Sequence, residues 1–474
     1  MALASKFMLG IVAAVVIVIF AVAGYLGAGP REGDVEVVVE GDEVSRLDTG
    51  LGYYSIAFVR DGRLYLASLD YFSGSVVVKV IDLESMTVAD ERVFKVDERG
   101  FGPEGFRLVN VEPSRPALYF LASDWSRVVE VDLGSFSLRE YELPSHVGGY
   151  LVFSGSVVAY YSSTYKPDKP GPYEAYIALY DLEERRGITR VTIYSGEPPF
   201  PKASLMAYGS KIIVIVSEEG EYQDLGEPGL FKASWREKIY VFDVETGEQR
   251  FLVLDRGPFT GYGISFAKLS PGHEDVGINE RFLLLAGEVS MGLDPEQRAY
   301  NVTVLIDVID LDKGEIVWSK TLSAATNTSQ NPFDPDVVDY GGGDILFYLV
   351  RANGSATRYA LVLDAAQGRV YEVEFSLGPG YRGVPMSPEY VSEDLTLALT
   401  MIHPLFGVGT GLTYIRVYDK VEDELWTIRL NIPDLDPPAQ NQIIHATKSH
   451  VYILSKNEFV SDNMLLYKIP LKRP

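Results

Sequence analysis

Two groups of aspartates are the residues of this sequence best suited to hold a metal ion. Asp334, Asp336 and Asp339 form one group, and a second surrounds Asp310. Hard cations such as Ca²⁺ take several carboxylate and carbonyl oxygens as ligands. Neither group matches the twelve-residue calcium loop with its closing glutamate, so solvated acidic loops are the alternative to a structural Ca²⁺ site. The first group is the metal candidate, and no other cofactor is expected.

The common catalytic motifs are absent from the sequence. It has no Gly-x-Ser-x-Gly, no HExxH, no phosphate-binding loop and no dinucleotide fingerprint. It has no cysteine and five scattered histidines, which excludes thiol catalysis, thiolate zinc sites and disulfides. The net charge of −24 repels a phosphate backbone, so nucleic acid is not an expected partner. These absences predict a protein that is not an enzyme, although a pair of glycosidase carboxylates on separate loops would leave no motif.

Three insertions rich in glycine, proline or aromatic residues are the candidate contact segments. They are Tyr165–Tyr173, Glu218–Arg236 and His403–Gly411. Long loops of this composition are often functional, and aromatic side chains at a loop tip suit contact with a protein or a sugar. The alternative is that each loop folds back over its own unit. The expected partner-binding residues are Tyr165, Tyr173, Tyr222, Phe231, Trp235 and Phe406.

Three Asn-x-Ser/Thr sequons occur, at Asn301, Asn327 and Asn353. Such sequons are glycosylation acceptors in exported chains. They are the candidate modification sites, although Asn301 falls inside an expected strand.

The first 30 residues are typical of a transmembrane anchor. No charged residue occurs between Lys6 and Arg31, and a helix over most of that stretch would span about 33 Å, enough for a hydrocarbon core. Acidic residues follow it, so the positive-inside bias places the N-terminus in the cytoplasm and the body outside. A signal peptide cleaved near Ala23 is the alternative. Either way the body is exported, and the retained form is a single-pass protein of the cell membrane.

A short pattern recurs along the body at spacings of 49 to 67 residues. A run of apolar residues ends in an aspartate, which is followed by a turn and a more alternating strand; the aspartates are Asp82, Asp132, Asp181, Asp243, Asp310, Asp364 and Asp419. A second, unbroken apolar run precedes each pattern and suits a buried strand. We expect each aspartate to end the third strand of a unit and to accept backbone N–H bonds in the turn.

Four antiparallel strands per repeat predict an all-β fold, a single β-propeller with eight blades favoured and seven as the alternative. A β-helix needs a period of about 20–30 residues, and a pair of sandwiches would not repeat one turn seven times. The last unit has three strands, and the strand Val35–Val39 is available to complete it and remove the open edge. The predicted propeller therefore spans residues 31–474, with its ring closed by strand 35–39.

One turn carries a resemblance to a known family. Asp310, Gly314 and Trp318 form the pattern Asp-x-x-x-Gly-x-x-x-Trp, and Asp243 and Gly247 match its first two positions. This pattern resembles the repeats of quinoprotein-type β-propellers, in which the tryptophan docks blades together. The resemblance implies the blade architecture and does not imply the redox cofactor, because the vicinal disulfide common at that family's quinone site has no counterpart in a chain without cysteine.

The function predicted from these features is binding or scaffolding by a membrane-anchored, extracytoplasmic propeller. Its partner would be an envelope protein, a glycan or a membrane-complex subunit. The alternative is an enzyme or cofactor-binding propeller with its site at the channel mouth or on one loop face, where propellers commonly place sites. A tight cluster of buried polar groups at the channel mouth would favour the alternative, whereas an exposed apolar loop face would favour binding.

Overall fold

The computed structural model describes residues 36–474, apart from positions 55, 103–104, 113–116, 148, 166–171, 198–199, 268–275, 279–280, 295–298, 327–335, 340–344, 352–356, 365–368, 376–386, 392–393, 403–411, 420, 437–438 and 458–459. Regular structure in this part is almost all strand, with short 3-10 turns such as η1 (Gly41–Glu43) and η4 (Pro433–Leu435). None of the helices described there is long and apolar enough to cross a membrane. The expected anchor, residues 1–30, lies outside the described part.

The strands form eight consecutive sheets, numbered here in chain order. Sheet 1 contains β3 (Ile56–Arg60), β4 (Arg63–Asp70), β5 (Ser75–Asp82) and β6 (Thr87–Lys95). Sheet 2 contains β7 (Phe106–Glu112), β8 (Ala117–Ala122), β9 (Arg127–Asp132) and β10 (Ser137–Glu142). Sheet 3 contains β11 (Tyr150–Ser154), β12 (Val157–Ser163), β13 (Tyr173–Asp181) and β14 (Arg186–Gly196). Sheet 4 contains β15 (Lys202–Tyr208), β16 (Lys211–Asp224), β17 (Leu230–Asp243) and β18 (Gln249–Tyr262).

The second half of the chain repeats the arrangement with additions. Sheet 5 contains β19 (Ser265–Ala267), β20 (Val276–Ile278), β21 (Phe282–Asp294), β22 (Ala299–Asp310) and β23 (Glu315–Thr326). Sheet 6 contains β24 (Asp336–Asp339), β25 (Ile345–Arg351), β26 (Thr357–Asp364) and β27 (Arg369–Phe375). Sheet 7 contains β28 (Ser387–Val391), β29 (Leu395–Ile402), β30 (Leu412–Asp419), β31 (Glu424–Asn431) and β1 (Glu36–Glu40). Sheet 8 contains β32 (Gln440–Ala446), β33 (His450–Lys456), β34 (Leu465–Pro470) and β2 (Ser45–Asp48).

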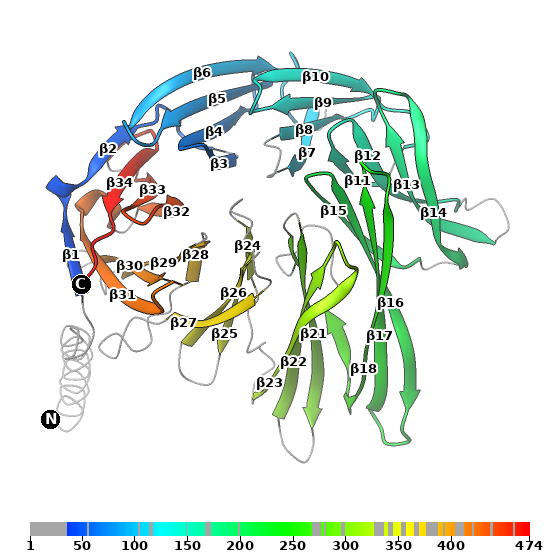
Figure 1. The fold of residues 1–474 in the computed structure, drawn as a ribbon. Coiled ribbons are helices and arrows are strands. Elements are labelled where there is room, and N and C mark those ends of the chain that lie inside the picture. Colours follow the sequence, from blue (N-terminus) through cyan, green and yellow to red (C-terminus); the bar gives the residue numbers. More distant parts are fainter. Residues whose placement is uncertain are drawn as a thin grey trace, which may run out of the picture.

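The sheets stand around a common centre, with their first strands innermost (Figure 1). Buried apolar side chains fill the space between neighbours: Leu69 and Phe120 belong to one cluster that joins sheets 1 and 2. Sheet 8 packs against sheet 1 in the same way, through a cluster that contains Leu454 and Leu64. A ring of antiparallel sheets in which the last packs against the first is a β-propeller, as the repeat predicted.

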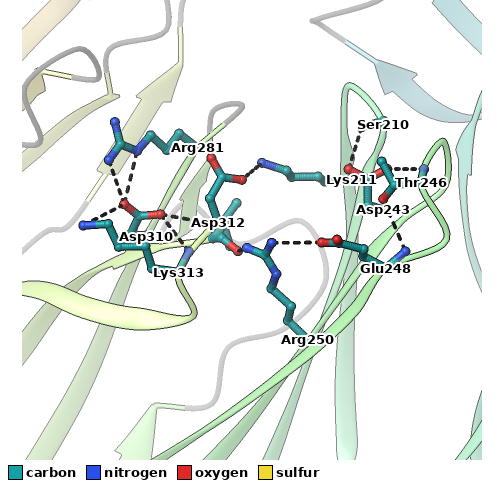
Figure 2. Close-up of polar contacts among 11 residues, drawn as sticks. Ser210, Lys211, Asp243, Thr246, Glu248, Arg250, Arg281, Asp310, Asp312 and Lys313 are labelled. Atoms are coloured by element: carbon teal, nitrogen blue, oxygen red, sulfur yellow. Dashed lines mark hydrogen bonds and ion pairs between the residues drawn. The ribbon is translucent and has the colours of Figure 1, made fainter.

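The aspartate at the end of the third strand organises the following turn as expected. In sheet 4 the Asp243 carboxylate accepts the backbone N–H groups of Glu245 (3.0 Å) and Thr246 (2.9 Å), as Figure 2 shows for Thr246. The same two bonds, from residues two and three positions later, form at Asp132, Asp181, Asp310 and Asp419. These bonds satisfy backbone N–H groups of the turn that have no partner in the hydrogen-bond ladder between the strands.

Asp310 shows how such a carboxylate stays charged when it is buried. Burial alone would raise its pKa, because no part of the residue is exposed. The Arg281 guanidinium and the backbone N–H groups of Lys313 and Asp312 outweigh that effect and hold the pKa of Asp310 below its ordinary value. The turn therefore keeps its ionised acceptor at neutral pH.

The residue four positions after the aspartate adopts a left-handed backbone. Gly247 (φ +73°) and Gly314 (φ +69°) occupy this position in sheets 4 and 5. Other residue types occupy it in sheets 1, 2, 3 and 7 with φ between +53° and +56°: Met86, Phe136, Arg185 and Asp423. Only glycine adopts this conformation without a steric cost of about 1–2 kcal/mol per residue. The same turn geometry therefore recurs in these six sheets, although only two of them have glycine at this position.

We expect Arg185→Gly to raise the free energy of unfolding by about 0.5–1 kcal/mol, because it removes the left-handed strain. The lost ion pair between Arg185 and Glu142 contributes little, since the two side chains are 69% and 72% exposed. Gly314→Ala is the matched control and should lower stability by about 1 kcal/mol through strain alone, since nothing lies within 4 Å of its added Cβ. Urea unfolding measures both; destabilisation by Arg185→Gly would contradict this reading of the turn.

The N-terminal segment completes sheet 8 through a different strand from the one expected. β2 pairs antiparallel with β34 and forms the outer strand of sheet 8. β1, which contains most of the segment 35–39, pairs parallel with β31 and adds a fifth strand to sheet 7. The sequence of β1 is rich in valine because this strand packs against sheet 7, where Val39 is fully buried. β2, in contrast, is mostly exposed. The closing strand is therefore Ser45–Asp48 and not 35–39.

Polar contacts fix β2 against the two last sheets. The Arg46 guanidinium donates to the Asp434 carboxylate (2.7 Å), which also accepts the Tyr467 hydroxyl (3.1 Å). Burial, with the Asp434 charge beside it, raises the pKa of Tyr467, so its phenol stays protonated as a donor. The Thr49 hydroxyl donates to the Met464 carbonyl oxygen (2.9 Å). The closing strand is thus bonded by side chains as well as by its ladder.

Asp436, which follows η4 between sheets 7 and 8, makes stability depend on pH. Burial raises the pKa of Asp436 to about 6, against a weaker lowering by the Thr413 hydroxyl. Between pH 4 and 6 the unfolded chain loses this proton while the folded chain keeps it, so stability falls as pH rises. Asp436→Asn should be more stable than the parent by about 1 kcal/mol at pH 7, after allowance for partial exposure, and equal to it at pH 4. Thermal unfolding at the two pH values tests this; an equal difference at both would exclude it.

Candidate binding surface

The two faces of the ring differ in the connections they carry. Because successive strands alternate in direction, the connections from second to third strands emerge on one face, named here the hairpin face. The connections from third to fourth strands, with their aspartates, emerge on the opposite face, named here the turn face. The segments that precede the first strands also reach the hairpin face.

Exposed aromatic side chains are concentrated on the hairpin face. Among the described residues twenty large apolar side chains are exposed; outside the strands, six of them lie in connections of the hairpin face and one, Val421, in a connection of the turn face. Nine lie on the fourth strands, and four of these nine are the second residues after a turn-face connection: Val88, Leu138, Ile316 and Leu425. The remaining ten lie at the hairpin face: Tyr53, Tyr71, Phe72, Tyr150, Tyr165, Tyr222, Leu225, Leu293, Leu412 and Val460. Phe72, at the tip of the β4–β5 connection, is 96% exposed. A face enriched in exposed aromatic groups is typical of an interaction surface.

Sheets 4 and 5 extend past the others on this face (Figure 1). β16, β17 and β18 have 14 residues each, and β21, β22 and β23 have 13, 12 and 12. A strand of 14 residues spans about 46 Å, roughly twice the length of a 7-residue strand. We call the projecting halves of these two sheets the extension.

The extension has its own apolar core. Ala233 and Trp235 of β17 pack with Val289 of β21 in one buried cluster. The Trp235 ring lies directly over β21, because a Cβ on Gly287 would come within 2.7 Å of its Cζ2 atom. The lack of a side chain at Gly287 therefore lets the two sheets approach each other.

A buried group of charges joins the same two sheets. Arg256 of β18 donates through Nε to Glu237 of β17 (2.6 Å) and through Nη1 to Asp307 of β22. Ser319 of β23 donates to the other oxygen of Asp307. Arg256 is 6% exposed and Glu237 is 2% exposed. Both carboxylates are held by one guanidinium, so this group acts as a structural tie rather than as a free acid–base pair.

Charged contacts also join sheets 4 and 5 at the turn face, as Figure 2 shows. Lys211 donates to Asp312 (2.7 Å), and Arg250 donates to the backbone carbonyl of Leu311 (2.8 Å). A cavity of about 900 Å³ opens beside them, but its lining side chains Lys211 and Asp312 already pair with each other. The two sheets are therefore joined at the turn face as well as through the core and the buried charges of the extension.

The outer part of the extension carries exposed apolar groups and a polar cavity. Tyr222 packs on Phe231 with ring centroids 4.6 Å apart, and it stays 57% exposed. A cavity of about 510 Å³ lies alongside, lined among others by Gln223, Lys232 and Arg236. A rigid projection with an aromatic tip and a polar cavity is suited to contact a protein surface.

The sequence-derived contact residues are distributed differently from expectation. The segment Glu218–Arg236 is not a loop: it continues β16 and begins β17, because Ala233 and Trp235 pair and pack as strand residues. Trp235 (6% exposed) and Tyr173 (8% exposed) are buried, and Phe231 is half-buried. Tyr165 and Tyr222 are exposed at the hairpin face, 44% and 57% respectively. Phe406 and the insertion 403–411 lie outside the described residues.

The remaining candidate residues are only partly described. Asp336 and Asp339 begin and end β24, whereas Asp334 lies outside the described part. In that part no group of three or more His, Asp or Glu side chains is arranged to hold a metal ion. Asn301 lies in β22, paired on both sides within the sheet. Asn327 and Asn353 lie outside the described residues.

Sequence reasoning did not find Phe72 or Arg256. Phe72 sits in a four-residue turn, Tyr71–Gly74, too short to be noticed as an insertion. Arg256 lies within β18, an alternating fourth strand in which arginine is an ordinary outer residue. Glu237 stands between Arg236 and Lys238 in β17, so no local pattern marks it as the buried carboxylate that needs a cationic partner.

No protein-family profile and no curated protein sequence matches this chain. Solved structures with a related course of the chain include the WD40 domain of SCAP from fission yeast, 11% identical over 90% of this chain and 98% of that chain, with a TM-score of 0.38. The β-propeller domain of the Trilobed protease from Pyrococcus furiosus is 11% identical over 79% and 97%, with a TM-score of 0.31. A prolyl endopeptidase is 14% identical over 86% of this chain and 55% of its own, with a TM-score of 0.38.

TM-scores of this size do not establish a shared fold. The propeller assignment therefore rests on the sheets of this chain and on the contact between the last sheet and the first. The resemblance to quinoprotein-type repeats remains a prediction from the turn motif.

Proposed function

We propose that this protein is a membrane-anchored, extracytoplasmic propeller that binds another envelope or membrane protein through its hairpin face. The observation that carries the proposal is the distribution of exposed aromatic side chains: of the seven among the described residues, six lie on the hairpin face and none lies in a connection of the turn face. Such an asymmetry has no structural purpose in the ring, because the blades pack through their sheet faces. It suits a partner that covers one side of the disc.

The extension supports the same proposal by its rigidity. Tyr222 packs on Phe231, which itself packs against the apolar core of the extension, so the exposed tyrosine is positioned before a partner arrives. A preformed surface loses little conformational entropy on binding, which favours affinity. The acidic overall charge supports solubility of the exported body and favours partners that are not strongly acidic.

The membrane location is proposed from the sequence of residues 1–30. A retained anchor predicts that protease added to right-side-out vesicles removes the body while the protein stays in the membrane fraction. Recovery of a shortened, soluble chain that begins near Gly24 would show cleavage, and a body protected from protease would contradict export.

We expect the triple variant Phe72→Ser, Tyr222→Ser, Leu293→Ser to lose its partner. Exposed hot-spot side chains contribute about 2 kcal/mol or more, so recovery of a crosslinked partner from native membranes should fall at least about thirtyfold. The matched control replaces three equally apolar, exposed residues of the fourth strands: Val93→Ser, Phe251→Ser, Val317→Ser. If only the control variant loses the partner, the binding surface lies on the fourth strands and the proposal for the hairpin face is wrong.

An enzyme or cofactor-binding propeller remains the second candidate. No catalytic site is evident in the described residues: the buried carboxylates of Glu237 and Asp307 both accept hydrogen bonds from Arg256. Turnover is therefore not part of the proposal.

A further inference from the structure

The segment Leu471–Pro474, named here the strap, crosses from sheet 8 to sheet 7 at the turn face. It follows β34, the third strand of sheet 8, and reaches β31 and β1 (Figure 1). Arg473 forms an ion pair with the carboxylate of Asp419, the aspartate that ends the third strand of sheet 7. The central carbon of the Arg473 guanidinium lies 5.6 Å from the centroid of the Trp426 ring, so the cation stands over the ring face. Sheet 8 thus supplies a guanidinium group to its neighbour.

The two groups that receive Arg473 are buried and fixed in place. The side chain of Asp419 is 4% exposed, and its Oδ1 accepts the backbone N–H groups of Val421 (2.9 Å) and Glu422 (3.1 Å). Trp426 is equally buried and packs within the apolar cluster that joins sheets 7 and 8. Both groups are therefore held by contacts that do not involve Arg473. Because a buried carboxylate without a cationic partner is costly, this site requires a cation.

The strap itself is held much less firmly. The Leu471 N–H donates to the Ser449 carbonyl oxygen (2.8 Å), but residues 472–474 form no backbone hydrogen bond with the described part of the chain. The Arg473 side chain is 46% exposed. Lys472 pairs with Glu43, and both side chains are partly exposed, so this pair adds little. A firm site with a weakly held occupant is the arrangement expected of a strap that can leave.

Sheet 5 contains the same kind of site with an occupant that stays. Asp310 is fully buried at the end of its third strand, and its Oδ2 accepts hydrogen bonds from Nη2 (3.0 Å) and Nε (3.1 Å) of Arg281 (Figure 2). Arg281 immediately precedes β21, so the sheet keeps it beside its carboxylate. The carboxylate at the end of a third strand is thus a guanidinium site in this fold. In sheet 7 the guanidinium comes from a segment outside any strand.

We propose that Asp419 and Trp426 form a guanidinium-binding site on the turn face, and that the strap occupies it reversibly through Arg473. When the strap leaves, the site binds the guanidinium group of another arginine side chain. A guanidinium suits the site better than an ammonium group, because a planar, weakly hydrated cation lies over an indole ring while it donates to a carboxylate. The site is independent of the proposed partner, since it lies on the face opposite to the hairpin face.

Saturation-transfer NMR on the full chain in detergent tests this with N-acetyl-L-arginine amide, a probe whose only charge is its guanidinium. Arg473→Ala vacates the site. This variant should bind the probe with a Kd of roughly 10 mM, as expected for one charge-assisted pair and one cation–π contact. The parent should bind it about tenfold more weakly, because the tethered Arg473 competes for the site.

Two variants control this result. Arg236→Ala removes the arginine from the exposed Asp255 and should bind the probe as weakly as the parent does. Arg473→Ala combined with Asp419→Asn should lose the probe, although asparagine keeps an oxygen for the N–H groups of the turn. Four results would overturn the proposal: no signal with Arg473→Ala, equal binding by Arg473→Ala and the parent, binding retained by the double variant, or equally tight binding of N-acetyl-L-lysine amide to Arg473→Ala.

Discussion

Arg256→Met is expected to lower the free energy of unfolding by about 3–5 kcal/mol. The change leaves the carboxylates of Glu237 and Asp307 in a buried site without the guanidinium that pairs with both. Removing one partner of a buried ion group costs this much because the remaining charges stay desolvated. Methionine keeps most of the volume, so the loss reports charge rather than packing. Urea unfolding of the two proteins measures the difference.

Arg236→Met is the matched control from the same region. Arg236 pairs with Asp255 at 2.6 Å, but the two side chains are 51% and 68% exposed. Exposed pairs of this kind contribute about 0–1 kcal/mol. The triple variant Glu237→Gln, Arg256→Met, Asp307→Asn should recover much of the loss, because it removes the uncompensated charge. A cost for Arg256→Met no larger than for Arg236→Met would show that the cluster does not join the two sheets.

Replacing residues 45–48 by Gly-Ser-Gly-Ser is expected to release the outer edge of sheet 8. The ladder with β34 and the Arg46–Asp434 contact are lost, and at about 1 kcal/mol per hydrogen bond the ring should lose about 3 kcal/mol or more. Hydrogen exchange gives the sharpest readout, because the amides of Leu465–Pro470 should lose protection while those of β31 keep it.

The corresponding replacement of Glu36–Glu40 is the control for this result. It removes β1 from the edge of sheet 7, so β31 should lose protection while β34 keeps it. The opposite pattern, with β34 exposed by the change at 36–40, would restore the original expectation for that segment. The pair of variants thus decides which N-terminal strand closes the ring.

The repeat was predictable because it has a local physical cause. Each third strand must end in a turn whose N–H groups need an acceptor, and aspartate supplies it within two or three residues. The apolar second strands are buried between neighbouring sheets, so their composition is equally constrained. The order of the units along the chain, and the positions of their second and third strands, could therefore be predicted from the sequence.

The remaining features depend on contacts between distant residues. β2, which closes the ring, is mostly exposed and has no hydrophobic pattern. β1 is rich in valine because it packs against sheet 7. A prediction from hydrophobicity alone therefore chooses β1 as the closing strand, which is wrong. Trp235 looks like an exposed loop aromatic until Gly287, 52 positions later, provides the space that receives it. The left-handed position after the aspartate holds Met86, Phe136 or Arg185 because the turn imposes its geometry whatever the residue. None of these is encoded in a local pattern.

Site-specific photo-crosslinking in intact cells tests the binding face most directly. A photoreactive phenylalanine analogue is placed in turn at Phe72, Tyr222 and Leu293 on the hairpin face, at Val93 and Phe251 on the fourth strands, and at Val421 on the turn face. Hairpin-face binding predicts one adduct of common mass from the first three positions and none from the other three. An adduct formed only from Val421, or only from Val93 and Phe251, would contradict it.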